Sequence, residues 1–241
     1  MGRGTRTFGL AVTMVLTAAC WFAASAGATF HEMRIRAIFE GPGAHTGFIQ
    51  LQMLAPGQNF TAGHVVNYYD TSGTLSHTSP PLPNVPNGVD QGTILIGDTS
   101  TPGSPDLVWG TMRSSITSDA GGGALCYENI DCVAWGSWTP TNLAKLPSPE
   151  TAPLSGLSIS QVAIRSITRG CPTALDVADD TNASAADFTF GIFQPRNNSV
   201  TPTEVPCPAS VPASTAAKKK CRKRKNHAVS SKKRKCKKRK H

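Results

Sequence analysis

The stretch "MRIRAIFEGPGAHTGFIQLQM", residues 33–53, contains two segments in which apolar and polar side chains alternate. The apolar set is Met33, Ile35, Ala37, Ile49, Leu51 and Met53, and the polar set is Arg34, Arg36, Gln50 and Gln52. A repeat of two residues is the period of a β-strand that has one buried and one solvent-exposed face. The stretch therefore predicts two half-buried strands.

Further strand patterns follow along the chain, separated by stretches rich in Gly, Pro, Asn and Ser. They lie at residues 63–70, 92–98, 123–138 and 157–167, the third being two strands joined by Asn129-Ile130-Asp131. Helical periodicity is nearly absent, and we expect only short helical turns near 111–118 and 183–188. Short strands and irregular loops, such as the Pro-rich loop 79–88, predict an all-β fold built as a single antiparallel sandwich.

The order of these segments resembles the lamin-tail-like domain, an immunoglobulin-type β-sandwich found in many secreted bacterial proteins. The resemblance rests on "FIQL" in 48–51, "GTILIGD" in 92–98, "GALCYENIDCVAWGSW" in 123–138 and "FTFGIFQPRNN" in 188–198. It covers residues 29–198 and departs from the family at Gln50, where a Glu is usual, and in the long loop 79–88. It implies an immunoglobulin-like sandwich rather than one function, because such domains occur in enzymes, adhesins and lamins alike.

The first 28 residues have the three parts of a secretory signal peptide. Arg3 and Arg6 precede an uncharged apolar run, and small residues allow cleavage after Ala26 or Ala28, of which we favour Ala28. A retained membrane anchor and a lipid anchor at Cys20 are the alternatives. This signal predicts a protein that is secreted or associated with the outside of the cell envelope. The layout of signal, sandwich and basic end is similar to a class of small exported bacterial proteins.

Cysteine content agrees with export. The chain has seven cysteines, and the signal peptide removes Cys20. An even number of cysteines in an exported chain indicates disulfides, although six cysteines allow 15 pairings. Proximity in the sequence favours Cys126–Cys132, Cys171–Cys207 and Cys221–Cys236, with two free thiols as the alternative for the last pair.

Charge divides sharply along the chain. Residues 29–217 hold seven Arg or Lys and 15 Asp or Glu, a formal charge of −8, whereas residues 218–241 carry +15. At the end of the acidic part, residues 199–217 are rich in Pro and lack aromatic residues, which predicts an extended linker to the basic end. We expect 218–241 to be a disordered basic tail. Its cationic residues are Lys218, Lys219, Lys220, Arg222, Lys223, Arg224, Lys225, Lys232, Lys233, Arg234, Lys235, Lys237, Lys238, Arg239 and Lys240.

The tail is the strongest interaction signal. It has no aromatic residues for base stacking, so it should recognise charge density rather than sequence. Outside a cell the matching partners are anionic cell-wall polymers, anionic lipid surfaces or extracellular nucleic acid. We therefore predict a non-enzymatic exported β-sandwich attached to the envelope or to other polyanions by its tail. The alternatives are a module whose sandwich recognises a partner protein or polysaccharide, and a secreted hydrolase with an unrecognised site. The oligomeric state is left open.

One segment offers hard oxygen ligands suited to calcium. The candidate ligands are Asp176, Asp179, Asp180, Asn182 and Asp187. Their spacing is not that of an EF-hand. The alternative is a solvated loop in which Asn182 or Ser184 caps a helical turn that contains Asp187. No other cofactor is predicted.

Catalytic motifs are not recognisable in the sequence. His31-Glu32 lacks the second histidine of a zinc-protease helix, and Gly121-Gly122-Gly123 lacks the Lys-Ser/Thr of a phosphate loop. His45, His64 and His77 are scattered. The tryptophans Trp109, Trp135 and Trp138 are expected to pack in or at the edge of the core rather than to form a sugar-stacking platform.

Overall fold

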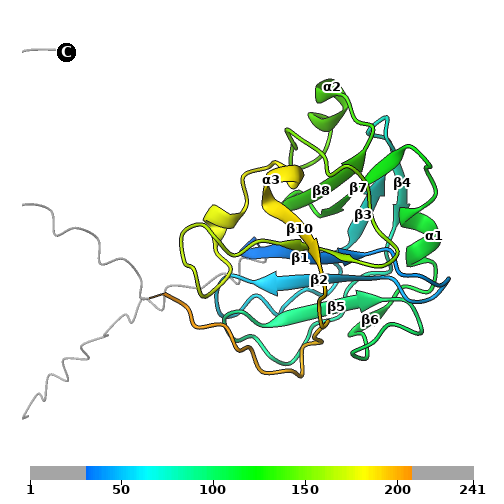
Figure 1. Ribbon diagram of the computed structural model, residues 1–241. Helices are drawn as coiled ribbons and strands as arrows, with labels where there is room; N and C mark the ends of the chain where they lie inside the picture. The colour runs from blue at the N-terminus through cyan, green and yellow to red at the C-terminus, as the bar shows by residue number, and fades with distance from the viewer. Residues whose placement is uncertain (1–30, 208–241) are drawn as a thin grey trace, which may run out of the picture. The chain divides into compact units, whose positions relative to one another are not determined.

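The computed structural model describes residues 31–207, and its two β-sheets pack face to face (Figure 1). The first predicted strand pair lies at the centre of a six-stranded sheet, here called sheet A. Its strands, in spatial order, are β10 (Phe188–Gly191), β9 (Val162–Arg165), β1 (Met33–Phe39), β2 (Phe48–Met53), β5 (Thr93–Gly97) and β6 (Leu107–Val108). All neighbours are antiparallel except β5 and β6, which pair in parallel.

Sheet B has four strands, all antiparallel. They are, in order, β4 (Leu75–Thr78), β3 (Val66–Tyr69), β7 (Gly122–Tyr127) and β8 (Asp131–Gly136). The helices are short: α1 (Met112–Ile116), α2 (Pro140–Leu143), η1 (Val177–Asp179) and α3 (Ser184–Asp187). The all-β class is confirmed, and so are the helical turns predicted near 111–118 and 183–188. The immunoglobulin arrangement stays a prediction.

Strand β1 contains a bulge that changes which residues face the core. Ile35 pairs with Leu51 and Ala37 pairs with Gln50, so Arg36 is an extra residue in β1. Beyond the bulge, Ile38 instead of Ala37 joins the core between the sheets, and Ala37 packs on the outer face of sheet A. The predicted alternation therefore holds only up to Ile35.

The outer face of β2 is also not the solvent-exposed face that its glutamines predicted. Gln50 and Gln52 are both 0% exposed. Residues 193–207, here called the strap, cover them: the Arg196 N–H donates to Gln50 Oε1 at 2.6 Å, and Gln52 Nε2 donates to Glu204 Oε1 at 3.2 Å. Alternation identified the face correctly, but a distant segment of the chain buries it.

The core between the sheets takes apolar side chains from both of them. They include Met33, Ile35, Ile38, Ile49, Leu51, Met53, Ile94 and Ile96 of sheet A, and Val66, Tyr68, Leu125, Tyr127, Val133 and Trp135 of sheet B. Trp109 and Trp135 are each 4% exposed, so the prediction that they pack in the core is confirmed. Trp138 lies half-buried on the outer face of sheet B.

The predicted hairpin of 123–138 forms β7 and β8, and its disulfide is confirmed. Cys126 and Cys132 face each other in the register of the pair and are bonded. The bridge lies in a small apolar cluster on the outer face of sheet B, against Leu143 and Leu146. Within residues 31–207, no helix is long and apolar enough to span a lipid bilayer.

The contact between Gly123 and Tyr68 generates a stability prediction. A Cβ at Gly123 would lie 2.3 Å from Tyr68 Cε2, inside the packed core. We expect Gly123→Ala to lower the free energy of unfolding by about 1–3 kcal/mol, because the buried ring has no room to move. Urea unfolding of both proteins measures the change.

Gly110→Ala is the matched control, because nothing lies within 4 Å of a Cβ at that position. It should change the free energy of unfolding by less than about 0.5 kcal/mol. Equal effects of the two substitutions would show that the Tyr68 ring does not pack as described.

Candidate functional site at the C-terminal strap

The strap leads toward the predicted basic tail, so its attachment to the domain is the first candidate for function. Figure 1 shows it running from the end of β10 along sheet A. Thr93 Oγ1 of β5 donates to the carbonyl oxygen of Arg196 at 2.9 Å. Residues 199–207 lie within the segment predicted as a linker, yet they belong to the folded part of the chain, up to Cys207.

Asn198 fastens the start of the strap through its side chain and backbone. Its Oδ1 accepts from the Asn87 N–H at 2.7 Å, and its Nδ2 donates to the carbonyl oxygens of Asn87 and Thr93. Its own N–H donates to Asp106 Oδ2 at 2.9 Å. Asn198 is 1% exposed, and its bond to the Thr93 carbonyl oxygen is fully buried.

Arg196 and Glu204 close the middle of the strap on itself. Both guanidinium Nη atoms donate to the Glu204 carboxylate, one of them at 2.9 Å. Burial raises the pKa of Glu204, but the hydrogen bonds from Arg196 and from the backbone N–H groups of Thr203 and Glu204, together with the charge of Arg196, outweigh it, and the pKa lies below its usual value. The paired geometry is the strong, two-point form of an Arg–carboxylate contact.

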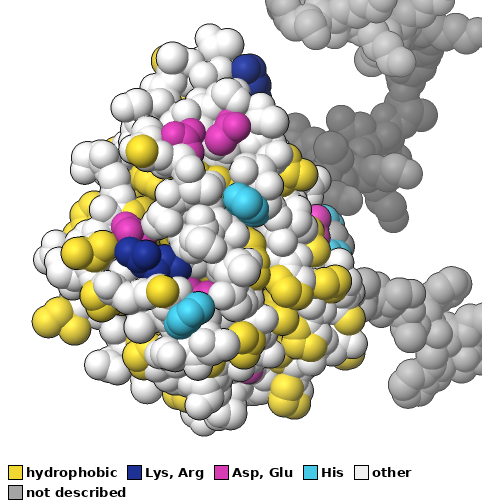
Figure 2. Space-filling model, turned by 90° about the vertical axis from the view of Figure 1, so that its right-hand side faces the viewer, with side chains coloured by type: hydrophobic (Ala, Val, Ile, Leu, Met, Phe, Trp, Pro, Cys, Tyr) yellow, Lys and Arg dark blue, Asp and Glu magenta, His cyan; other side chains and the backbone are white. Residues whose placement is uncertain are grey.

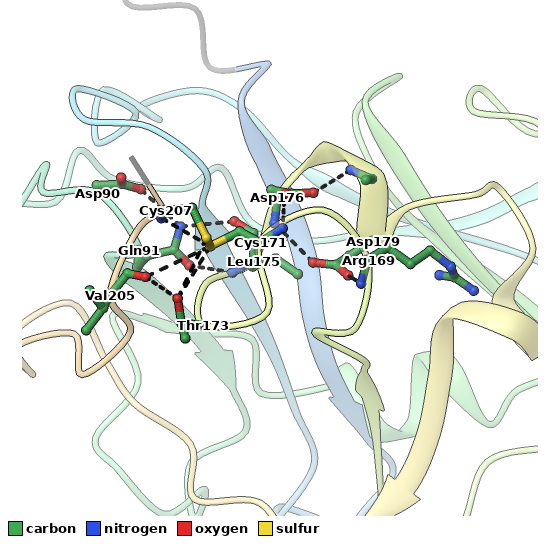
Figure 3. The surroundings of a disulfide bond; sticks show 11 residues. Asp90, Gln91, Arg169, Cys171, Thr173, Leu175, Asp176, Asp179, Val205 and Cys207 are labelled. Atoms are coloured by element: carbon green, nitrogen blue, oxygen red, sulfur yellow. Dashed lines mark hydrogen bonds between the residues drawn. A yellow bond between two sulfur atoms is a disulfide. The ribbon is translucent and has the colours of Figure 1, made fainter. Parts of the chain in front are cut away.

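A disulfide fastens the end of the strap (Figure 3). Cys207 is bonded to Cys171, which confirms the second predicted pair. Beside the bridge, Thr173 Oγ1 donates to the Val205 carbonyl oxygen at 2.6 Å, and the Val205 N–H donates back to Thr173 O at 3.2 Å. The two cysteines are 36 positions apart, a loop whose closure is worth about 4 kcal/mol by chain entropy.

The loop that presents Cys171 is held rigid by two carboxylates (Figure 3). Asp176 accepts from the Cys171 N–H at 2.6 Å and from the Ala178 N–H at 2.7 Å. Asp179, 0% exposed, accepts from the backbone N–H groups of Thr168 and Arg169 and, as in a capping box, from that of Asp176. These bonds fix the position of Cys171 toward the strap.

The other three candidate calcium ligands, Asp180, Asn182 and Asp187, form ion pairs with arginines or hydrogen bonds with neighbouring loops. Asp180 forms ion pairs with Arg34 at 2.8 Å and Arg165 at 3.2 Å. Asp187 lies 2.9 Å from Arg169 and accepts from the Thr181 N–H at 2.8 Å. Asn182 accepts from the Ser148 hydroxyl at 3.1 Å.

The predicted calcium site is therefore not supported. Within residues 31–207 no group of three or more His, Cys, Asp or Glu side chains has an arrangement that could hold a metal ion. Arginine guanidiniums and backbone N–H groups satisfy the carboxylates instead. The alternative is right about the helical turn, α3, but wrong in two details: Asp179 and Asp187 are buried rather than solvated, and neither Asn182 nor Ser184 caps the turn.

Sequence reasoning missed the residue around which these acids gather, Arg165 of β9. Its Nη2 donates to both carboxylate oxygens of Asp131, at 2.7 and 2.8 Å, and its side chain is 1% exposed. A lone arginine in a predicted strand gives no sign of being buried. The concentration of acids in 176–187 was the signal that pointed to a cation, and the cation proves to be a side chain.

Glu150 lies beside this centre without an arginine of its own. It is 4% exposed and accepts from Ser184 N at 2.8 Å and Ser184 Oγ at 2.7 Å. Burial raises the pKa of Glu150 to about 7, and the nearby Asp131 adds to the rise. The position is closed to solvent, so we assign Glu150 a role in folding.

The tail residues Lys218–Lys240, which carry the predicted polyanion contacts, and the pair Cys221–Cys236 lie outside the described residues. Comparison with family models, with curated proteins and with solved structures finds no match to this chain. The lamin-tail resemblance thus stays a prediction, as does the prediction that the protein is not an enzyme.

Removal of the Cys171–Cys207 disulfide tests whether this bond holds the end of the strap against the domain. In the double variant Cys171→Ser/Cys207→Ser, we expect the free energy of unfolding to fall by about 2–4 kcal/mol. Hydrogen exchange at the Val205 amide should become faster than in the parent, because its bond to Thr173 loses the covalent clamp. The double variant Cys126→Ser/Cys132→Ser is the control, and it should leave exchange in the strap unchanged. Slow exchange at Val205 in both variants would contradict the assignment.

The raised pKa of Glu150 predicts how stability changes with pH. A carboxyl whose pKa is higher in the folded state favours folding while protonated, so this stability is complete below about pH 4.5 and is lost as the pH rises through about 7. We expect Glu150→Gln to remove a decline on the order of 2–3 kcal/mol between pH 5 and 8. Urea unfolding across this range measures the decline.

The control is Glu32→Gln, at an exposed carboxyl, which should preserve the decline. If Glu150→Gln also preserves it, Glu150 is not the titrating group.

Proposed function

We propose that this protein is a non-enzymatic, exported β-sandwich that its cationic tail attaches to polyanions of the cell envelope or its surroundings. The folded part supplies a stable acidic body, and the tail supplies the attraction. The alternative of a cytoplasmic or nuclear nucleic-acid tail is disfavoured by the predicted signal peptide and by the two disulfides. Disulfides of this kind belong to oxidising, extracellular environments.

The main support for this proposal is that most Arg and Lys side chains of the folded part already bind carboxylates of the same domain. Five of its seven Arg and Lys side chains form ion pairs with carboxylates: Arg34, Arg113, Arg165, Arg169 and Arg196. Arg36 lies half-buried over the Phe193 ring at 5.8 Å. Lys145 is exposed but donates to the Ser72 carbonyl oxygen.

Residues 31–207 therefore offer no basic patch to a polyanion, and their formal charge of −8 would repel one. Any such attraction must come from residues 218–241. The strap supports this division, because a disulfide and two hydrogen bonds between Thr173 and Val205, one from a side chain and one from the backbone, secure the chain near Cys207. A tail that attaches the protein to a surface needs a firm connection to the folded domain.

We further propose that the sandwich is a lamin-tail-like domain. The arrangement supports it in two places: β1 and β2 form the expected first strand pair, and β7 and β8 form the hairpin that contains Asp131, Val133 and Trp135. The six-stranded sheet A and the parallel β5–β6 pair go beyond a seven-stranded immunoglobulin domain. Membership of this family implies the fold but does not specify a ligand, so the proposed attachment depends on the tail.

The tail prediction uses duplex DNA as a polyanion of known charge density. If 6–10 tail residues engage it, affinity should fall about 10³–10⁵-fold between 50 and 200 mM salt. Changing the 15 tail Lys and Arg residues to Gln should abolish binding to DNA and sedimentation with isolated cell envelopes. Titration and sedimentation at the two salt concentrations measure both effects.

The control is a tail of identical composition in scrambled order. It should bind as the parent does, because the contacts are to charge density. Undiminished binding of the Gln variant would refute the proposal, and loss of binding on scrambling would show that the tail reads a sequence.

A further inference from the structure

A cleft of about 420 Å³ opens where the ends of β7 and β8 approach α1, away from the strap contacts. Its lining includes the segment 155–157, which follows Leu154; the backbone of Leu154 pairs in parallel with that of Trp135. The lining also includes Glu40, which follows β1, and the end of α1. This volume lies within the range of small-molecule sites.

Part of the lining of the cleft consists of glycines, because the backbones there approach too closely for side chains. Gly122 and Gly136 face each other across β7 and β8, both with positive φ. A Cβ on Gly122 would lie 2.1 Å from the Trp135 carbonyl oxygen, and one on Gly136 would lie 2.2 Å from that of Gly121. This part of the lining is therefore main chain.

The charged residues that line the cleft are two acids. They are Glu40 and Asp119, and among the described residues the lining has no Lys, Arg or His. Glu40 forms an ion pair with Arg113 at 3.2 Å, so the negative charge of the cleft rests mainly on Asp119. Asp119 accepts from the N–H groups of Thr71 and Gly121 and from the Thr71 hydroxyl, and these bonds lower its pKa. An ionised carboxylate in the lining repels anions and accepts hydrogen bonds. Charged side chains are sparse on the face that carries α1 (Figure 2).

The remaining lining combines three hydroxyls with one half-buried apolar side chain. Thr117, Ser137 and Ser155 supply the hydroxyls. Leu157 supplies the accessible apolar atoms, because Ile116 and Trp135 are only 1% and 4% exposed. A sugar ring presents the complementary groups: hydroxyls that donate to carboxylates and exchange bonds with serines, and a C–H face that packs on apolar atoms. We propose that this cleft binds a saccharide that is not anionic, either neutral or bearing an amino group.

This site is independent of the tail and has the opposite charge preference. A polyanion attracted by residues 218–241 is repelled at the cleft, whereas an uncharged sugar gains nothing from the tail. High salt separates the two, because it screens the tail's attraction and leaves hydrogen bonds and apolar contacts in place. Failure of one proposal thus leaves the other standing.

The experiment titrates the full mature chain at 0.5 M NaCl with three hexasaccharide probes by calorimetry. The probes are neutral N-acetylchitohexaose, cationic chitosan hexamer and anionic hexagalacturonate. We expect binding of the neutral probe, the amino probe or both, and at least tenfold weaker binding of the anionic one. Binding of none of the three, or preference for the anionic probe, overturns the proposal.

Gly156→Phe locates the site. Nothing lies within 4 Å of a Cβ at Gly156, so the ring enters open space at the lining without a clash. It should weaken sugar binding at least tenfold at an unchanged melting temperature. Gly110→Phe, equally open but outside the lining, should bind as the parent does. The variant Ser137→Ala/Ser155→Ala should weaken binding about five- to tenfold by loss of two hydroxyls. Equal binding by all four proteins overturns the assignment to this cleft.

Discussion

The buried ion pair between Arg165 and Asp131 is the constraint on which the rest of the fold depends. Arg165 belongs to β9 of sheet A and Asp131 to β8 of sheet B, so their contact joins the two sheets. Both side chains are 1% exposed. Removing one partner of such a pair leaves an unpaired charge in the interior, at a cost of about 3–5 kcal/mol. The sheets are therefore fixed relative to each other by electrostatics as well as by packing.

The same pair accounts for the irregularity of β1. The Ile35 N–H donates to Asp131 Oδ2 at 2.6 Å, and the Ile35 carbonyl oxygen accepts from Arg165 Nε at 3.0 Å. Side chains thus take the place of ladder bonds at Ile35, and the pairing of β1 with β9 is confined to Ala37 and Ile38. The bulge at Arg36, in the pairing of β1 with β2, lies directly after this point.

Around this centre most arginines of residues 31–207 form ion pairs with carboxylates of the same domain. The folded part therefore presents few unpaired cations to a polyanion. The acids of 176–187 surround arginines or hold the loop of Cys171, and that loop in turn receives Cys207 at the end of the strap. One network therefore links the sheet interface to the point where the described chain ends.

The sequence by itself determined what depends on short range. Period-two alternation located β1 and β2, an apolar run between turn residues located β5, and a turn between two strand patterns located the β7–β8 hairpin. Proximity in the sequence paired both disulfides of the described residues. Tertiary structure alone decided the burial of Gln50 and Gln52, the bulge at Arg36 and the use of the acidic loop. The burial of Gln50 depends on Arg196, 146 positions away. The acids of 176–187 depend on arginines of other segments, such as Arg34 of β1 and Arg165 of β9. Local patterns record which residues share a face, but they carry no information about which distant segment covers that face or neutralises a charge on it.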